Sequence, residues 1–191
     1  MSSPHIITAA VLDYRLAIDD ETVIRPLRAS DTAAVYDCIM RNTEHLREWM
    51  TWIDGLNGPS DVAAWLRSAE KEAYDHSAFK AAIWRRSTLA GFIDLHDIDW
   101  KNGSASIGYW LDRTFTGQGL MTQAVQLLTE YGFEALNLHR LEIHVATENH
   151  ASRRIPERLG FRLEGVLRGA QRLRGTYVDH ALYATIRDDA P

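Results

Sequence analysis

A strand, a glycine-bearing loop and a helix follow one another in the middle of the chain, and this run most restricts the fold. The strand is expected over Ser104–Leu111, where apolar residues predominate after a turn at residues 101–103. The helix is expected over Met121–Leu136, where apolar residues recur at helical spacing. Residues 112–120 join the two elements, so the helix starts directly after the glycine-bearing loop.

The loop between this strand and this helix has the features of an anion site. Gly117 and Gly119 allow the backbone to come close to a ligand, because no Cβ stands in the way. The first N–H groups of the helix lack internal partners, and the helix dipole is positive there, so a diphosphate would fit. The loop lacks the Gly-Lys-Ser/Thr of a P-loop and the third glycine of a dinucleotide fingerprint. Taken alone, a Gly-x-Gly pair could equally be a tight structural turn.

The remaining segments mix strand patterns with helical patterns, which predicts an α+β fold with a mixed, mostly antiparallel sheet flanked by helices. Residues 1–20 are expected to form an N-terminal extension or an edge strand, and residues 21–187 a single domain. Strands are expected over Thr22–Leu27, Phe79–Trp84, Leu89–Ile98, Leu141–Ala146, Phe161–Val166 and Tyr177–Arg187, and helices over Thr32–Arg41, from Ser60 to about Tyr74, and over Ser152–Leu159.

Composition excludes several classes of protein. A chain of 191 residues with a net charge of −5 is a poor candidate for direct nucleic-acid binding. No apolar run approaches the roughly 18 residues of a membrane span, and the start has no signal-peptide pattern. Cys38 is the only cysteine, so an internal disulfide is excluded and a cytoplasmic location is expected. No HExxH motif or cysteine cluster indicates a metal site.

A second motif follows the strand that ends at Ala146, and it consists of Asn149, Ser152 and the run Leu159–Gly165. With the loop at 116–121 and the run His45–Trp52, this arrangement resembles the GCN5-related N-acetyltransferases (GNAT), and most closely their RimJ/RimL branch. The resemblance covers roughly residues 20–187 and is most specific from 104 to 165. It implies the GNAT fold, with the sheet splayed between the strands at about 104–111 and 141–147.

The resemblance also implies the cosubstrate and its site. Acetyl-CoA would donate an acetyl group, and no metal would take part. The loop would give backbone N–H groups to the pyrophosphate, the strand before it would pair with the pantetheine arm, and an arginine after Ser152 would contact the 3′-phosphate. The residues implied to bind acetyl-CoA are Tyr109, Trp110, Leu111, Gly117, Gln118, Gly119, Leu120, Met121, Asn149, Ser152 and Arg154.

In this family the amine attacks the thioester directly, in a ternary complex. Ser152 would stabilise the departing thiolate, because the tyrosine that many relatives carry four residues later is replaced here by Pro156. Proton removal from the acceptor ammonium needs a base, and Glu142 and His144 on the polar face of their strand are the predicted pair. Further candidates are Asp94 and His96 on one face of another strand, Glu164, His180, or a positioned water.

The acceptor is the least determined part of the reaction. Trp49 and Trp52 could form an aromatic wall for it, and acidic residues nearby would favour a cation such as a protein N-terminal amine. The RimJ/RimL branch implies a ribosomal-protein-like N-terminus. A small amine or an aminoacyl nucleotide is the alternative acceptor, and a non-catalytic acyl-CoA-binding sensor is the alternative class. Relatives often pair as homodimers, so a homodimer is also expected.

Overall fold

The computed structural model describes residues 14–189. Only residues 14–20 of the predicted N-terminal segment are therefore described, and they include a short strand, β1 (Leu16–Asp19). This strand pairs antiparallel with β2 (Thr22–Pro26) and lies at one edge of the sheet. No helix within the described residues is long and apolar enough to cross a bilayer.

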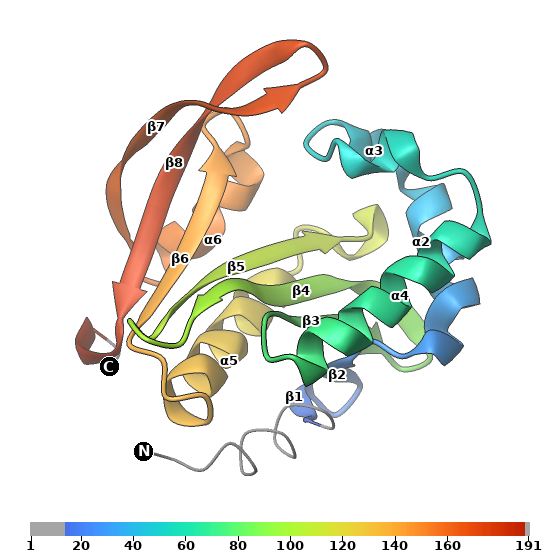
Figure 1. Ribbon diagram of the computed structural model, residues 1–191, viewed down its shortest axis with the longest axis horizontal. Helices are drawn as coiled ribbons and strands as arrows, with labels where there is room; N and C mark the ends of the chain where they lie inside the picture. Colours follow the sequence, from blue (N-terminus) through green and yellow to red (C-terminus); the bar gives the residue numbers. More distant parts are fainter. Residues whose placement is uncertain (1–13, 190–191) are drawn as a thin grey trace.

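The described strands form one sheet in the order β1-β2-β3-β4-β5-β6-β8-β7, as Figure 1 shows. The β5–β6 pair is parallel, and every other pairing between the described strands is antiparallel. The α+β prediction with a mostly antiparallel sheet is therefore confirmed. The strands not yet given are β3 (Phe79–Arg85), β4 (Thr88–Asp99), β5 (Ser104–Leu111), β6 (Arg140–Ala146), β7 (Arg162–Leu173) and β8 (Thr176–Ile186).

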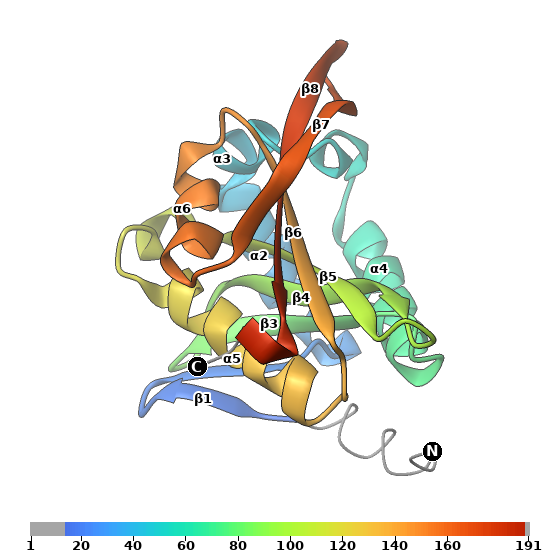
Figure 2. The same cartoon turned by 90° about the vertical axis from the view of Figure 1, so that its left-hand side faces the viewer.

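Helices cover both faces of this sheet. Figure 2 shows α5 (Leu120–Glu134) and α6 (His150–Arg158) on one side and α4 (Pro59–Tyr74) on the other. The helices α2 (Thr32–Arg41) and α3 (Thr43–Arg47) lie on the α4 side, where α2 packs against α4 and β4. Each side has its own apolar core, because alternate residues of the central strands point to opposite faces.

The alternation on β4 shows how the two cores are divided. Ile93 and Leu95 are buried in the core beneath α5, whereas Phe92 belongs to the core beneath α2 and α4. The polar residues Asp94 and His96 share the Phe92 face of the strand, as their sequence spacing predicts. This face of β4 therefore carries apolar packing at one end and titratable groups at the other.

The sheet opens between β5 and β6. These strands pair at Ser104–Arg140, Ala105–Leu141 and Ser106–Glu142 and at no later position, although both continue for several residues. Beyond this point β6 stays paired with β8 along its whole length, and β5 stays paired with β4. The predicted splay between these strands is confirmed, and it leaves a wedge with unpaired backbone along one side of residues 107–111 (Figure 1).

The sheet ends in a long hairpin made by β7 and β8, which rises away from the rest of the molecule in Figures 1 and 2. β7 runs to Leu173, well beyond the Val166 end expected from sequence. Its residues are exposed along almost the whole strand, so no alternation of buried and polar residues marks this extension. Pairing with β8, interrupted by two register shifts, holds it instead.

Candidate active site

The glycine loop places the start of α5 beside open space. Gly117 and Gly119 have φ values of +75° and +77°, and nothing lies within 4 Å of the position that a Cβ would take on either residue. The first hydrogen bond into α5 runs from Gln123 N to Gly119 O, so the N–H groups of the preceding helical residues are available to a ligand. The side chains of Leu120 and Met121 are buried and anchor this turn to the core. The loop therefore fits a pyrophosphate.

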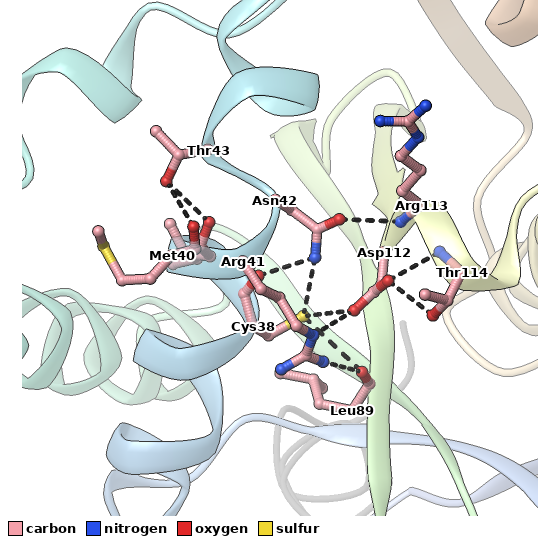
Figure 3. Close-up of polar contacts among 10 residues, drawn as sticks. Cys38, Met40, Arg41, Asn42, Thr43, Leu89, Asp112, Arg113 and Thr114 are labelled. Carbon is pink, nitrogen blue, oxygen red and sulfur yellow. Dashed lines mark hydrogen bonds and ion pairs between the residues drawn. The ribbon is translucent and has the colours of Figure 1, made fainter.

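A buried carboxylate fixes the loop where it leaves β5 (Figure 3). Asp112 is 1% exposed and accepts hydrogen bonds from the backbone N and the hydroxyl of Thr114, both at 2.8 Å, and from Arg41 Nε at 2.5 Å. Asn42 Oδ1 accepts from Arg113 N at 2.9 Å. Burial alone would raise the pKa of Asp112, but hydrogen bonds from Thr114 and Arg41 outweigh it and lower the pKa to about 2. The end of α2 is thus joined to the loop.

The side chain of Gln118 braces the loop internally. Its Nε2 donates to Thr114 O at 3.0 Å, and its Oε1 accepts from Arg85 at 3.1 Å. The side chain of Gln118 therefore stabilises the loop, and only its backbone N–H remains available for the predicted contact with the pyrophosphate.

A serine and a tyrosine meet across the wedge. Ser152 Oγ donates to the Tyr109 phenol at 3.2 Å, and the same phenol donates to Ser152 O at 3.1 Å. Tyr109 comes from β5 and Ser152 from the first turn of α6, where Asn149 Oδ1 caps the helix by accepting from Ser152 N at 3.1 Å. Burial raises the pKa of Tyr109, so its phenol stays protonated. Tyr109 therefore places a phenol beside Ser152, a contact that the sequence did not predict.

The two arginines after Ser152 have different surroundings. Arg153 donates to Tyr183 Oη and Thr147 O, both at 2.9 Å, and lies near Glu157. Arg154 is exposed. The contact between Arg154 and the 3′-phosphate stays a prediction. Because Arg153 is already engaged by Tyr183 and Thr147, Arg154 is the better candidate of the two for this phosphate.

A cavity of about 520 Å³ lies on the α4 side of the sheet. Several aromatic side chains contribute to its wall, including Trp52, Trp65, Phe92 and Trp110. Phe92 stacks near Trp110 with ring centroids 4.6 Å apart. Of the two tryptophans predicted to contact an acceptor, Trp52 lines the cavity and Trp49 does not. Trp65 and Phe92 could not be predicted, because residues from different elements form this wall only after folding.

The polar end of the cavity holds Asp94 and His96, together with Gly108 and Tyr109 of β5. Asp94 Oδ1 lies 2.8 Å from His96 Nδ1 and accepts from Gly108 N at 3.1 Å. Tyr109 also contacts Ser152, so one residue of β5 borders both the cavity and Ser152. The arrangement can hold a molecule beside the site where the strands part.

The pair predicted as the base has a different environment. Glu142 accepts from Arg140 Nε at 2.7 Å and lies 3.0 Å from His144 Nε2, while Arg140 also binds Glu164. Burial alone would raise the pKa of Glu142, but the hydrogen bonds from His144 and Arg140 outweigh it and lower the pKa. Neither Glu142 nor His144 lines the cavity. Their assignment as the base stays a prediction. His180, another candidate, lies 3.1 Å from Gln171.

No group of three or more His, Cys, Asp or Glu side chains within residues 14–189 is arranged to hold a metal ion. Cys38 is buried near Asp112 and Leu89 O, and burial raises the pKa of its thiol to about 12. The thiol is therefore protonated and has no nucleophilic character at neutral pH.

Comparisons with known proteins agree with this geometry. The sequence profile of the Acetyltransferase (GNAT) domain family matches residues 21–162. The ribosomal-protein-serine acetyltransferase of Escherichia coli (strain K12) is 28% identical over 173 residues, covering 91% of this chain and 97% of that protein. A structure of RimL, a ribosomal L7/L12 alpha-N-protein acetyltransferase in complex with coenzyme A, superimposes with a TM-score of 0.89 at 26% identity, covering 92% and 99% of the two chains.

A third similar protein was solved with a nucleotide bound in addition to the cosubstrate. The microcin C7 self immunity acetyltransferase MccE, solved in complex with acetyl-CoA and AMP, superimposes with a TM-score of 0.87 at 27% identity. The match covers 93% of this chain and 99% of that one.

Proposed function

The chain belongs to the Acetyltransferase (GNAT) domain family, and we propose that its acceptor is the N-terminal amine of a protein. The family predicted from the sequence is thereby confirmed, and the chain is an N-acetyltransferase that uses acetyl-CoA as its cosubstrate. The proposal on the acceptor draws on the ribosomal-protein acetyltransferases to which the chain is similar along nearly its whole length.

The cosubstrate, when bound, supplies an activated acyl group on a thiol that can leave. We propose that the N–H groups at the start of α5 bind its pyrophosphate and that the unpaired edge of residues 107–111 binds its pantetheine arm. Tyr109, Trp110 and Leu111 would contribute that edge, and Asn149 and Arg154 would contribute from the α6 side. The wedge and the open glycine loop support this assignment.

Ser152 is proposed to protonate or stabilise the departing sulfur. Its hydroxyl already donates to the Tyr109 phenol, so the two groups form a short chain along which a proton can move. The phenol has a raised pKa and is therefore a neutral partner that can return a proton to Ser152. We propose that this pair does the work of the tyrosine that many relatives carry at the position of Pro156.

The observation that carries the proposed function is the cavity beside the wedge. It combines aromatic surfaces with the Asp94 carboxylate, and both attract an ammonium group while leaving room for the rest of an N-terminal residue. Tyr109 borders the cavity and also contacts Ser152, and this shared residue supports the proposal that an amine held in the cavity would lie next to the acyl site. Binding in this position would replace an encounter in solution with a reaction between neighbouring groups.

The acceptor proposal is tested by incubating the purified protein and acetyl-CoA with three kinds of amine. These are peptides that begin with serine or alanine, an aminoacyl nucleotide, and a polyamine. We expect mass spectrometry to show one added acetyl group on the peptide N-terminus. Preferred acetylation of the aminoacyl nucleotide would instead assign the tryptophans to base stacking, as the similarity to MccE would suggest. Binding of acetyl-CoA without transfer to any amine would favour a sensor.

We also propose that two copies of the chain associate through the β7 side of the hairpin, and that the protein acts in the cytoplasm. β7 is an edge strand, and its large apolar side chains Leu163, Val166 and Leu167 are 52%, 50% and 41% exposed. An edge with this much apolar surface favours association. Sedimentation velocity of the wild type and of Val166→Asp tests it: a dimer that the substitution dissociates supports the proposal, and a monomeric wild type contradicts it.

A further inference from the structure

We propose that His96 is the catalytic residue that takes the proton from the acceptor ammonium, and that Asp94 is the positioning residue that orients it. The inference rests on the proposed function, because it needs an amine in the cavity. It assigns a role to a pair on β4 in place of the Glu142–His144 pair predicted from the sequence.

The hydrogen bond between the two residues determines which nitrogen of His96 is free. Asp94 Oδ1 lies 2.8 Å from Nδ1, and an ionised carboxylate can only accept, so Nδ1 carries the proton. The other nitrogen, Nε2, then has a lone pair when the ring is neutral. The same Asp94 oxygen accepts from Gly108 N at 3.1 Å, which fixes the carboxylate to the neighbouring strand. Asp94 therefore holds both the tautomer and the orientation of the ring.

Gly108 leaves the space that this pair occupies. A Cβ on residue 108 would lie 2.6 Å from Asp94 Oδ1 and 3.2 Å from His96 Cε1, so any other residue would push the pair aside. Glycine weakens a strand interior and is found there where another group must come close. Its presence in the middle of β5 is explained by the carboxylate and the imidazole packed over it.

A register shift in β4 follows His96 directly. The pairing with β5 is irregular between His96 and Asp99, and Asp97 adopts a left-handed φ of +51°. Bulges of this kind bend a strand and change the direction of a side chain, and they are common beside active sites. The strand therefore departs from regular pairing at the point where the imidazole enters the cavity.

The charged groups around His96 come from several elements. On β4, Asp97 Oδ2 lies 3.8 Å from Nε2 but is mostly exposed. On β3, Lys80 also lines the cavity, where it pairs with Glu72 of α4, and Asp61 of α4 lies on the cavity wall. The face of β5 opposite contributes Ser106 and Gly108, neither of which is charged. The hydrogen bond to Asp94 is the largest influence and raises the pKa of His96.

In the proposed reaction, His96 takes up one of the two protons that the acceptor nitrogen loses. An acceptor ammonium gives a proton to Nε2 and becomes a neutral amine. The amine nitrogen then forms a bond to the acetyl carbon, and the carbon–sulfur bond breaks with its electron pair on sulfur. The second proton of the nitrogen ends on that sulfur through the Ser152 and Tyr109 hydroxyls. The products are the amide, the free thiol and a protonated His96, which returns its proton to water.

The experiment compares His96→Gln, Glu142→Gln and the control Glu134→Gln with the wild type, using an N-terminal peptide that the wild type acetylates. We expect His96→Gln to lower kcat about 100-fold, as loss of a general base does, with acetyl-CoA affinity unchanged in calorimetry. Glu142→Gln should lower kcat much less than His96→Gln does, and the control Glu134→Gln, at an exposed position in α5, should keep kcat close to the wild-type value. An unchanged kcat in His96→Gln, or a large loss confined to Glu142→Gln, overturns the proposal.

The pH dependence of kcat provides a second readout. In the wild type we expect kcat to rise with pH through one ionisation above the ordinary imidazole value of about 6.5, because His96 must be neutral. Asp94→Asn keeps an oxygen for Gly108 N but removes the charge, so the ionisation should move to lower pH as kcat falls. In the His96→Gln variant, this ionisation should be absent from the pH dependence of kcat.

The acceptor amine also titrates, and a second peptide separates the two groups. Its first residue carries a fluorinated side chain, which lowers the pKa of the amine. If the ionisation follows the amine rather than the enzyme, the proposal is overturned. If the wild type binds acetyl-CoA but acetylates no amine at all, this result contradicts the proposed function. The assignment of His96 is then contradicted as well, because it depends on that function.

Discussion

At the scale of single residues, the hydroxyl pair formed by Ser152 and Tyr109 should affect turnover but not the binding of acetyl-CoA. Ser152→Ala removes the group predicted to face the sulfur but keeps the backbone N–H that Asn149 caps. We therefore expect kcat to fall by about 10- to 100-fold, with little change in the dissociation constant for acetyl-CoA. Steady-state kinetics and calorimetry measure the two quantities. Ser87→Ala, at an exposed turn, is the control. Equal losses of binding and turnover would contradict the role.

Asp112 provides a prediction about pH and stability. Its pKa is about 2 in the folded protein and close to 4 when unfolded, so the stabilisation it gives is fully present above pH 4. That stabilisation, about 2 kcal/mol, is lost as the pH falls toward 2. Asp112→Asn should therefore unfold at lower urea concentration than the wild type at pH 7, and the difference should shrink in acid. Asp37→Asn, at an exposed position, is the control. A difference that stays constant with pH would contradict the assignment.

At the scale of elements, the loop and α5 together account for cosubstrate binding. Gly119→Glu places bulk and negative charge where the helix start faces the pyrophosphate, so we expect acetyl-CoA binding to be lost in calorimetry. Gly175→Glu is a matched control, because Gly175 has a similar φ of +88° and equally open space but lies in the β7–β8 turn. The control should bind normally. Binding that survives in Gly119→Glu would mean that the loop is only a structural turn.

Most elements could be predicted because local sequence patterns determine them. The strand Ser104–Leu111 and the helix Thr32–Arg41 have the expected boundaries, and α5 begins one residue earlier than expected. The splay came from the family resemblance and from no local pattern. The outer part of β7 could not be predicted, because an exposed strand held by its neighbour shows no alternation.

The parts of the site that lie within one segment of sequence could be predicted. The parts that form where several segments come together could not. The glycine loop and Ser152 stand in short motifs, so the sequence could point to them. The cavity is formed by α2, the segment around Trp52, α4 and β3–β5, and no periodicity indicates that Trp65 and Trp110 share a wall. Gly108 was assigned only to the pantetheine strand, because its second role depends on Asp94 across the sheet.

At the scale of the whole molecule, acetyl-CoA should stabilise the fold, because its proposed position spans the gap between two parts of the sheet. At a concentration 100 times the dissociation constant, binding to the folded state adds about 2.7 kcal/mol. For a chain of 191 residues this corresponds to a rise of roughly 5–10 °C in Tm. Differential scanning fluorimetry measures it. The Gly119→Glu variant should show no rise, and a wild type that does not respond would argue against the site.

The order of the site along the chain has an evolutionary consequence. Every described residue that lines the cavity precedes residue 111, whereas the pyrophosphate loop and Ser152 follow residue 112. Selection for a new acceptor can therefore act on the part of the gene before β5, while the pantetheine edge, the glycine loop and Ser152 stay unchanged. Lineages that share this architecture could exchange one amine for another by a few substitutions around Trp52 and Trp65. The segment from α2 to β3 is accordingly the place where a library of variants would best be directed.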